Sequence, residues 1–386
     1  VVIIVEGAVL PPFTVAMLPD TQHYSDSASN IVNFNNQTQW IIDNRVEENI
    51  AMVSHFGDIV NECANIIEWY RADAAMRIID SVPVQPYGAV LGNHDHQGGR
   101  EPNADATNYI AYFGKSRYID RHWYGDDSPD GRNHYHYFNA AGRRYLHLVL
   151  EYEVASSTIS NAAEIVAWAQ GVLDANATLP TIITTHVYLG ANGSRGARGE
   201  DIFNALVKGN PQVFMVLGGH VHGEAHSTAT NDSGQDVFQI LADFQGRNNG
   251  GDGWMVLAEF DEAKDAIDIT TYSPTLDKWE TDANSQYSFA MDFNARLGPI
   301  QPGPWIISSV PTGLADDAAT LNGEVLNDDA TEVILVWAGA DEGDITVNDW
   351  TAAPGGGSHA FGAVNQSDLL SHTLTGLPGD TRYHYR

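Results

Sequence analysis

Short apolar runs alternate along the first 260 or so residues with stretches in which apolar side chains recur at helical spacing. Five runs have the length of buried strands, at residues 13–18, 51–56, 87–91, 181–185 and 213–217. Helical spacing predicts helices over residues 37–50, 63–80, 162–175 and 200–209. This alternation, with runs so apolar, favours an α/β core whose strands are covered by helices.

The pattern changes after about residue 260. Residues 271–279 and 288–293 are expected to be closing strands, and LGPIQPGPW at 297–305 is typical of a linker. Only short strand patterns follow, at residues 319–325, 332–339, 371–377 and 381–386. We therefore expect two domains, residues 1–300 and residues 304–386, the second an all-β, immunoglobulin-like sandwich.

The charge balance narrows the range of partners. The chain has 386 residues, of which 43% are hydrophobic, so it can bury a large core and a smaller one. It carries 19 Lys and Arg against 50 Asp and Glu, a net charge of −31. Such a surface repels polyanions, which disfavours tight nucleic-acid binding but does not exclude a small anion held by a metal.

The cysteine count and the first residues exclude other classes. Cys63 is the single cysteine, which excludes an internal disulfide and a cysteine-based zinc site. The opening VVIIVEGAVLPP has no basic segment and is too short for a signal peptide or a membrane span. We expect it to be the start of a processed or trimmed chain, with no membrane-spanning segment.

Side chains of the kinds that bind metals follow all five predicted strands. In order along the chain they are Asp20 and Gln22, Asp58, Asn93 with His94 and Asp95, His186, and His220 with His222. In open α/β sheets, ligands bind outside the carboxyl ends of the strands. His220 and His222, two apart in extended chain, point to the same side about 6–7 Å apart. The sequence therefore predicts one metal site assembled from five strand ends.

The motif order D-x-Q, GD, GNHD, TH and GHVH resembles that of the calcineurin-like metallophosphoesterases, over roughly residues 13–260. The stretch LPDTQ is similar to a bacterial subset of that family. The resemblance implies a four-layer αββα sandwich with two metals at one edge. A mixed nitrogen and oxygen ligand set suits Mn, Fe, Zn or Mg.

The resemblance also implies a role for each matching residue. Asp58 matches the carboxylate that bridges the two metals. The first metal is then held by Asp20, Gln22 and His222, and the second by Asn93, His186 and His220. His94 matches a histidine outside the metal shell, near the leaving-group oxygen, with Asp95 placed to orient it.

Two positions depart from the family pattern. Gln22 stands where a histidine ligand is usual, and its carbonyl is a harder, weaker ligand. His23 follows at once but points the other way if the strand geometry persists. Asn61 stands where purple acid phosphatases have a tyrosine, so we expect no purple colour and a structural or outer role for Asn61.

These residues lead to a functional expectation. We expect a secreted bacterial enzyme that hydrolyses small phosphate esters by metal-activated hydroxide, with His94 as leaving-group acid. Diesters are favoured over the monoesters of an acid phosphatase or nucleotidase. The alternative of another class is a non-catalytic extracellular binding or adhesion protein on a phosphatase scaffold, which Gln22 favours and the retained His94 opposes.

The C-terminal stretch LTGLPGDTRYHYR resembles a fibronectin type III module, with Tyr383 at the tyrosine-corner position. The last strand of such a module is absent, so a truncated domain is expected. The stretch does not indicate what this accessory module binds.

Weaker candidates flank the motifs. His96, Arg195 and Arg198 are candidate substrate contacts, although exposed loops explain them as well. Asp243 either orients a ligating histidine or caps the next turn. The aromatic segment 133–138 alternates like a half-buried strand, which core packing explains.

Overall fold

The structure is a computed structural model of the chain. It describes residues 11–98, 103–157, 159–298, 305–315, 318–327, 330–338, 357–364, 369–375 and 384–385. In these ranges, no helix combines the length and the apolar character needed to cross a lipid bilayer.

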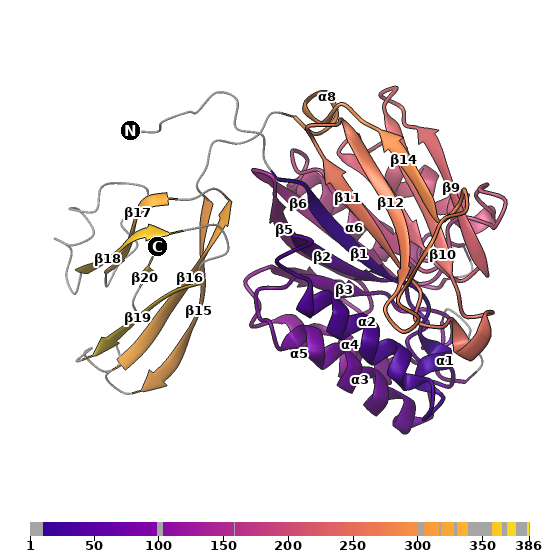
Figure 1. Ribbon diagram of the computed structural model, residues 1–386, viewed down its shortest axis with the longest axis horizontal. Helices are drawn as coiled ribbons and strands as arrows, with labels where there is room; N and C mark the ends of the chain where they lie inside the picture. Colours follow the sequence, from indigo (N-terminus) through magenta and orange to yellow (C-terminus); the bar gives the residue numbers. More distant parts are fainter. Residues whose placement is uncertain are drawn as a thin grey trace.

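The first of two large sheets has seven strands, in the order β13-β12-β11-β1-β2-β3 with β14 paired to β12 (Figure 1). Its strands are β1 (Phe13–Leu18), β2 (Ile50–His55), β3 (Tyr87–Ala89), β11 (Met255–Asp261), β12 (Ala266–Ser273), β13 (Lys278–Glu280) and β14 (Gln286–Ala290). β1, β2 and β3 are parallel neighbours, whereas β11 runs antiparallel to β1. The residues that follow the three parallel strands therefore emerge at one edge.

The second sheet also has seven strands, in the order β4-β5-β6-β7-β8-β10-β9. Its strands are β4 (Tyr124–Asp127), β5 (His134–Ala140), β6 (Arg143–Leu150), β7 (Thr181–Thr185), β8 (Val213–Gly218), β9 (Gly223–Thr230) and β10 (Asp236–Asp243). Three neighbouring pairs in this order are parallel, namely β6 with β7, β7 with β8 and β8 with β10. The carboxyl ends of these four strands therefore also share an edge.

Helices flank the two sheets. They are α1 (Gln22–Ser25), α2 (Ile31–Asp43), α3 (Ile66–Asp80), α4 (Thr107–Phe113), α5 (Lys115–Tyr118), α6 (Ala162–Ala175), α7 (Ala197–Ile202), the π-helix η1 (Phe203–Val207), the 3₁₀-helix η2 (Asn248–Gly250) and α8 (Phe293–Leu297). Asn65 caps α3 by accepting a hydrogen bond from the Ile67 amide, as expected for a helix N-terminus.

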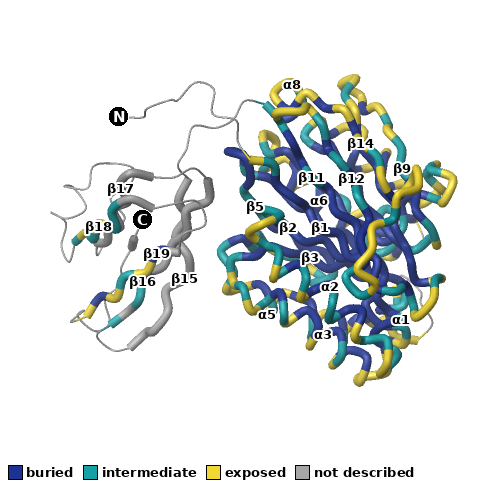
Figure 2. The backbone as a smooth tube through the Cα atoms, in the orientation of Figure 1, coloured by how far each residue is buried: buried dark blue, intermediate teal, exposed yellow. Residues whose placement is uncertain are grey.

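Three apolar clusters define the layers. One packs α2 and α3 against the outer face of the first sheet, for example Phe34 and Trp69 against Val53. The second fills the space between the sheets, where the Phe13 ring lies 5.5 Å from that of Tyr145. The third packs α6 and α7 against the second sheet. The four-layer αββα order implied by the family resemblance is present, and Figure 2 shows its buried strands.

Some predicted boundaries are wrong. The helix expected over residues 37–50 begins at Ile31 and ends at Asp43, and Ile50 belongs to β2. Val46, read as part of the apolar stripe, is 84% exposed. The predicted helix 162–175 agrees with α6, and the alternating segment 133–138 lies almost wholly in β5, with inner positions buried.

Three histidines form a buried group between the sheets. His134 and His136 on β5 have ring centroids 4.7 Å apart, and the His136 ring lies 6.2 Å from that of His147 on β6. Tyr118 and Trp123 pack on His136. Both His136 ring nitrogens are buried without a hydrogen-bond partner among the described residues.

Strands are also described near the C-terminus. β15 (Trp305–Ala315), β16 (Ala318–Asn327) and β19 (Leu369–Thr375) pair in one antiparallel sheet, and β17 (Ala330–Ala338), β18 (Gly357–Val364) and β20 (His384–Tyr385) pair in another. Tyr383, the predicted tyrosine corner, lies outside the described residues. The boundary between the two domains and the fibronectin-like character of the second stay predictions.

Candidate metal centre

The predicted ligands come together where both sheets end. Asp20 follows β1, Asp58 follows β2 and Asn93 follows β3, all from the first sheet. His186 follows β7 and His220 follows β8, both from the second sheet. Because each sheet presents the carboxyl ends of its parallel strands at this edge, residues far apart in the sequence share one site.

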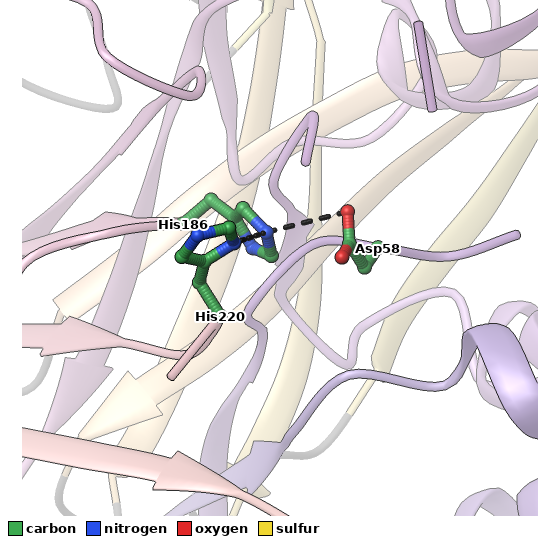
Figure 3. Close-up of side chains that lie close together, drawn as sticks. All are labelled: Asp58, His186 and His220. Atoms are coloured by element: carbon green, nitrogen blue, oxygen red, sulfur yellow. Dashed lines mark hydrogen bonds and ion pairs between the residues drawn. The ribbon is translucent and has the colours of Figure 1, made fainter. Parts of the chain in front are cut away.

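The centre of the site is formed by Asp58, His186 and His220, each of which offers a ligand atom within 4.8 Å of the others (Figure 3). The distance from His186 Nε2 to Asp58 Oδ1 is 3.3 Å, and to His220 Nδ1 it is 3.1 Å. Asp58 and His220 both have positive φ, 48° and 69°, which non-glycine residues adopt at a cost. Such strain is frequent at functional sites.

Several acceptor atoms converge on His186 Nε2. His186 Nδ1 lies 2.9 Å from the Phe56 carbonyl, which only accepts, so Nδ1 donates and Nε2 of the neutral ring presents a lone pair. Asn93 Oδ1, 3.0 Å away, and Asp58 Oδ1 are acceptors as well. A positive charge is needed among them, and either a proton on His186 or a metal ion supplies it.

Burial and the charges of neighbouring site residues shift the pKa values of Asp58, His186 and His220. Burial raises the pKa of Asp58, but the nearby His186 and His94 outweigh it and hold this pKa at about 2. Burial lowers the pKa of His186, but Asp58 more than compensates and raises it above its ordinary value. Burial and the charge of His186 lower the pKa of His220 to about 4. A neutral His220 is the form that binds a metal.

The first-metal side of the site is rich in oxygen. Asp20 is 2% exposed and accepts a hydrogen bond from the His220 amide at 3.1 Å. Burial, with the charges of Asp243 and Asp58, raises the pKa of Asp20 well above its ordinary value. A bound divalent cation reverses this effect by stabilising the carboxylates. The donor set therefore fits a cation.

Gln22 and His222 complete this side. Gln22 lies at the start of α1, and its Oε1 is buried with no hydrogen-bond partner among the described residues. His222 is exposed, and it lines the same cleft. His23 lines the cleft too, because α1 replaces the strand geometry that was expected to turn it away.

Two glycines let the backbone approach these ligands. A Cβ on Gly92 would lie 2.2 Å from the Asp58 amide nitrogen and 2.3 Å from Asp58 Oδ1. A Cβ on Gly219 would lie 2.1 Å from Asp20 Oδ1. The glycines of the GNHD and GGHVH motifs thus allow these loops to pack closely against Asp58 and Asp20.

His94 is oriented differently from the prediction. Its Nδ1 lies 2.9 Å from the Asn61 carbonyl, so Nδ1 donates and Nε2 is left towards the cleft, 4.0 Å from Asp58 Oδ2. Asp95 does not take this place: its carboxylate accepts from the amides of Val60 and Gly92 at 3.0 and 2.9 Å. Asp95 ties the GD and GNHD loops together, and the main chain of Asn61 orients His94.

The site opens into a cleft of about 490 Å³. Its lining is polar throughout and consists of Gln22, His23, Asp58, Asn61, Asn93, His94, His220, His222 and Gln245. Neither Lys nor Arg is among these described lining residues. The lining residues themselves therefore offer an anion no Lys or Arg contact.

The candidate substrate contacts have different positions. Arg195 hydrogen-bonds Glu200 and Gln239, at 3.0 and 2.7 Å, and its guanidinium lies 3.8 Å over the Phe203 ring. It is not among the residues that line the cleft, and its role as a substrate contact stays a prediction. His96 is also displaced: it is buried, with Nδ1 3.4 Å from the Ala104 carbonyl, and is not part of the cleft lining.

Arg198 lies nearer the site. It pairs with Glu153, its side chain is 48% exposed, and its charge adds to the burial and the His186 charge that lower the pKa of His220.

Two neighbours of the site were missed by sequence reasoning. Tyr152 follows β6, and its ring centroid lies 5.7 Å from that of His186 and 5.5 Å from that of His220. The sequence did offer a signal for Tyr152, because a polar segment follows the apolar run 146–150. That run lies in β6, which is parallel to β7, so its carboxyl end lies at the same edge as the site. Gln245 contacts Gln22, Asp20 and Asp243, and no local pattern marks it. Asp243 caps the turn by accepting from the Gln245 amide.

Comparison with known proteins gives a family match and one relative. A family model described as calcineurin-like phosphoesterase matches residues 13–224. The uncharacterized protein YvnB of Bacillus subtilis is 35% identical over 308 residues, which cover 76% of this chain. The match covers 23% of YvnB, so the chain spans about a quarter of the length of this curated relative.

Solved structures with a similar arrangement include two phosphatases. A dimetal phosphatase from Danio rerio aligns with a TM-score of 0.46 and 15% identity, over 72% of this chain and 99% of its own. A purple acid phosphatase from seeds of yellow lupin (Lupinus luteus) aligns with a TM-score of 0.47 and 14% identity, over 75% of this chain and 55% of its own.

Proposed function

Because the chain belongs to the calcineurin-like phosphoesterase family, we propose that it hydrolyses phosphate esters with the help of two divalent metal ions. The observation that carries this proposal is the convergence of acceptor atoms from Asp58, Asn93, His186 and His220 beside His94. The proposed ligands are Asp20, Gln22, Asp58, Asn93, His186, His220 and His222. Mn, Zn, Fe and Mg all suit this mixed set.

Two divalent ions held in such a site lower the pKa of a bound water and neutralise charge on the phosphate. The contribution of the chain itself is to place the ester. The buried carboxylate of Asp58 is fixed from two sides, by the His94 amide at 2.8 Å and by His186. A metal ion bound to this carboxylate would therefore have a fixed position, and so would a phosphate bound to that ion.

His94 is proposed to protonate the leaving group. The Asn61 carbonyl accepts the Nδ1 proton, so the proton given to the leaving group is the second one, which the imidazolium form carries on Nε2. A leaving alkoxide is a strong base, and a positioned acid that neutralises it accelerates the reaction. Asp95 supports this indirectly, by holding the loop that carries His94.

We propose that diesters are preferred over monoesters. A phosphate monoester carries nearly two negative charges at neutral pH, since its second pKa is about 6, whereas a diester carries one. The described lining of the cleft contains neither Lys nor Arg, and the chain has a net charge of −31. Both features penalise the more highly charged ester.

Arg198 is the proposed substrate contact outside the lining. Its ion pair with Glu153 leaves the guanidinium partly exposed near His220. From there it reaches a phosphate substituent that projects from the cleft. Arg195, tied to Glu200 and Gln239, is not proposed for this role.

The test is side-by-side hydrolysis of bis-p-nitrophenyl phosphate and p-nitrophenyl phosphate. The protein is stripped with chelator and supplied separately with Mn, Zn, Mg or Fe(II), with His94→Ala as a matched variant. Metal-dependent turnover of the diester supports the proposal. Turnover of the monoester alone assigns a phosphatase or nucleotidase. No turnover with any metal rejects an enzyme and favours a binding protein on a phosphatase scaffold.

We further propose that residues 304–386 form a fibronectin type III-like accessory domain and that the protein is secreted by a bacterium. The LTGLPGDTRYHYR stretch, the LPDTQ motif and the acidic surface support this proposal. Limited proteolysis tests the domain boundary: cleavage near residues 297–305 is expected to release two stable fragments. Fractionation of a bacterial host that carries the gene tests the location.

A further inference from the structure

We propose that Gln245 is a positioning residue that sets the orientation of the Gln22 amide, so that the oxygen of Gln22 and not its nitrogen faces the first metal position. This inference rests on the proposed two-metal function. It concerns a residue outside the motifs and explains how a glutamine can stand where the family usually has a histidine.

Two carboxylates orient Gln245. Its Nε2 lies 2.9 Å from Asp243 Oδ2 and 3.3 Å from Asp20 Oδ2, and its backbone amide donates to Asp243 Oδ1 at 2.9 Å. A carboxylate oxygen that carries no proton only accepts hydrogen bonds, so these contacts turn the amide nitrogen of Gln245 towards the pair. The oxygen of Gln245 then points the other way.

That oxygen orients Gln22 in turn. Gln245 Oε1 accepts a hydrogen bond from Gln22 Nε2. Gln22 lines the cleft, and its remaining Oε1 is buried and has no hydrogen-bond partner among the described residues. Buried polar atoms are nearly always satisfied, so an unpartnered one at a ligand position indicates an absent partner.

The chemistry of the two amide ends makes the orientation matter. A carbonyl oxygen binds a divalent cation, whereas an NH₂ group has no free lone pair and repels one. Without Gln245, the Gln22 amide is free to turn either end to the cleft. The relay from Asp20 and Asp243 through Gln245 removes that freedom, and it yields a first metal position dominated by hard oxygen ligands.

The experiment measures metal binding directly. Metal-free full-length protein is titrated with Mn²⁺ by calorimetry, with the bound ion counted independently by electron paramagnetic resonance. In Gln245→Met, which keeps the length of the side chain and loses its hydrogen bonds, we expect one Mn²⁺ to bind at least 10-fold more weakly. The other Mn²⁺, on the His186 side, is expected to change less than 2-fold.

The matched control is Gln37→Met. Gln37 is also fully buried, donates to the Trp254 carbonyl at 2.8 Å and also has an unpartnered Oε1, but it does not line the cleft. We expect both Mn²⁺ affinities to stay within 2-fold in this variant. Equal weakening in the two variants overturns the proposal, because it means that any lost buried glutamine disturbs the site.

A double-mutant cycle separates positioning from packing. In Gln22→His, an imidazole nitrogen replaces the amide, and its binding does not depend on an amide orientation. Gln245→Met is therefore expected to weaken Mn²⁺ binding less than 2-fold in the Gln22→His background. The same 10-fold loss in both backgrounds overturns the proposal.

The outcomes also distinguish this inference from the proposed function. If the unmodified protein binds two Mn²⁺ and hydrolyses esters while Gln245→Met binds as tightly, only the role of Gln245 is wrong. If the unmodified protein does not bind two ions, the proposed function fails as well. Should Gln245→Met not fold, the shorter Gln245→Asn, which cannot reach both partners, gives the same test with the same expected loss.

Discussion

The ring of His94 is held by the main-chain carbonyl of Asn61, 2.9 Å from Nδ1. This contact places a proton on Nδ1, so the acid role proposed for His94 requires a second proton on Nε2. It comes from the backbone of the GDIVN loop, so no side-chain substitution at position 61 removes the acceptor. The role of His94 can therefore be tested at His94 itself.

Replacement of His94 by Ala is expected to lower kcat about 100-fold or more for a diester with an alkyl leaving group, because the leaving alkoxide then has no proton donor. For bis-p-nitrophenyl phosphate the loss is expected to be clearly smaller, since nitrophenolate leaves without protonation. Steady-state kinetics on both esters measure the difference. Equal losses for the two leaving groups would show that His94 binds substrate and does not act as an acid.

Gly92→Ala is expected to lower the free energy of unfolding by on the order of 3 kcal/mol, because the new methyl group overlaps the amide of Asp58. The same clash displaces the Asp58 carboxylate, so metal binding falls as well. Urea unfolding and metal titration measure the two effects. Gly196→Ala is the control, since its methyl group would meet nothing within 4 Å and should change neither quantity.

Steady-state kinetics are expected to distinguish the roles of Arg198 and Arg195. Arg198→Ala should raise KM about 10-fold for phosphodiesters by removing a charge-assisted contact. Arg195→Ala should leave KM within 2-fold but lower the unfolding free energy by about 1–2 kcal/mol, since it removes the hydrogen bonds to Glu200 and Gln239. A rise in KM for Arg195→Ala alone would reverse the assignment.

Removal of metal is expected to destabilise the protein. Asp20, Asp58 and Asp243 are buried close together, and their mutual repulsion is relieved by a cation. At a free metal concentration 100 times the dissociation constant, binding adds about 2.7 kcal/mol to the free energy of unfolding. Thermal unfolding with Mn²⁺ and with chelator measures this, and Asp58→Asn should abolish most of the difference.

The buried histidines predict acid sensitivity. Burial lowers the pKa of His134 and of His147 to about 3, and burial with the charges of His134 and His147 lowers that of His136 well below its ordinary value. The unfolded chain therefore takes up protons first, below the ordinary pKa of about 6.5. Their contribution to stability is complete above that pH and is lost as the pH falls towards 3.

In His136→Phe, unfolding should take up about one proton fewer between pH 6 and 4.5. The free energy of unfolding should then fall with decreasing pH by about 1.4 kcal/mol less per pH unit. The substitution should also cost little stability at pH 7, because neither ring nitrogen of His136 has a partner among the described residues. Urea unfolding at several pH values provides the measurement. Parallel curves for the two proteins would contradict the assignment.

The five strand ends could be predicted because each is a local pattern: an apolar run, then a ligand residue. The agreement between the predicted helix 162–175 and α6 has the same origin. What the sequence could not show is non-local. Gln245 joins the site only because β10 lies beside β8, and Arg195 hydrogen-bonds Glu200 and Gln239.

The orientation of His94 illustrates the same limit. Asp95 is its neighbour in sequence, yet the Asp95 carboxylate accepts hydrogen bonds from the amides of Val60 and Gly92 and so connects the GD and GNHD loops. Backbone acceptors such as the Asn61 carbonyl carry no sequence signature. Residue types therefore indicate which chemistry is present, whereas tertiary contacts decide which atom performs it.

The division of the ligands between two sheets also orders events during synthesis. Asp20, Asp58 and Asn93 leave the ribosome before His186 and His220 exist. β1, which carries Asp20, pairs with β11 at residues 255–261. A nascent chain cannot complete the proposed centre until residues 255–261 have emerged, so metal binding there would follow the pairing of β1 with β11.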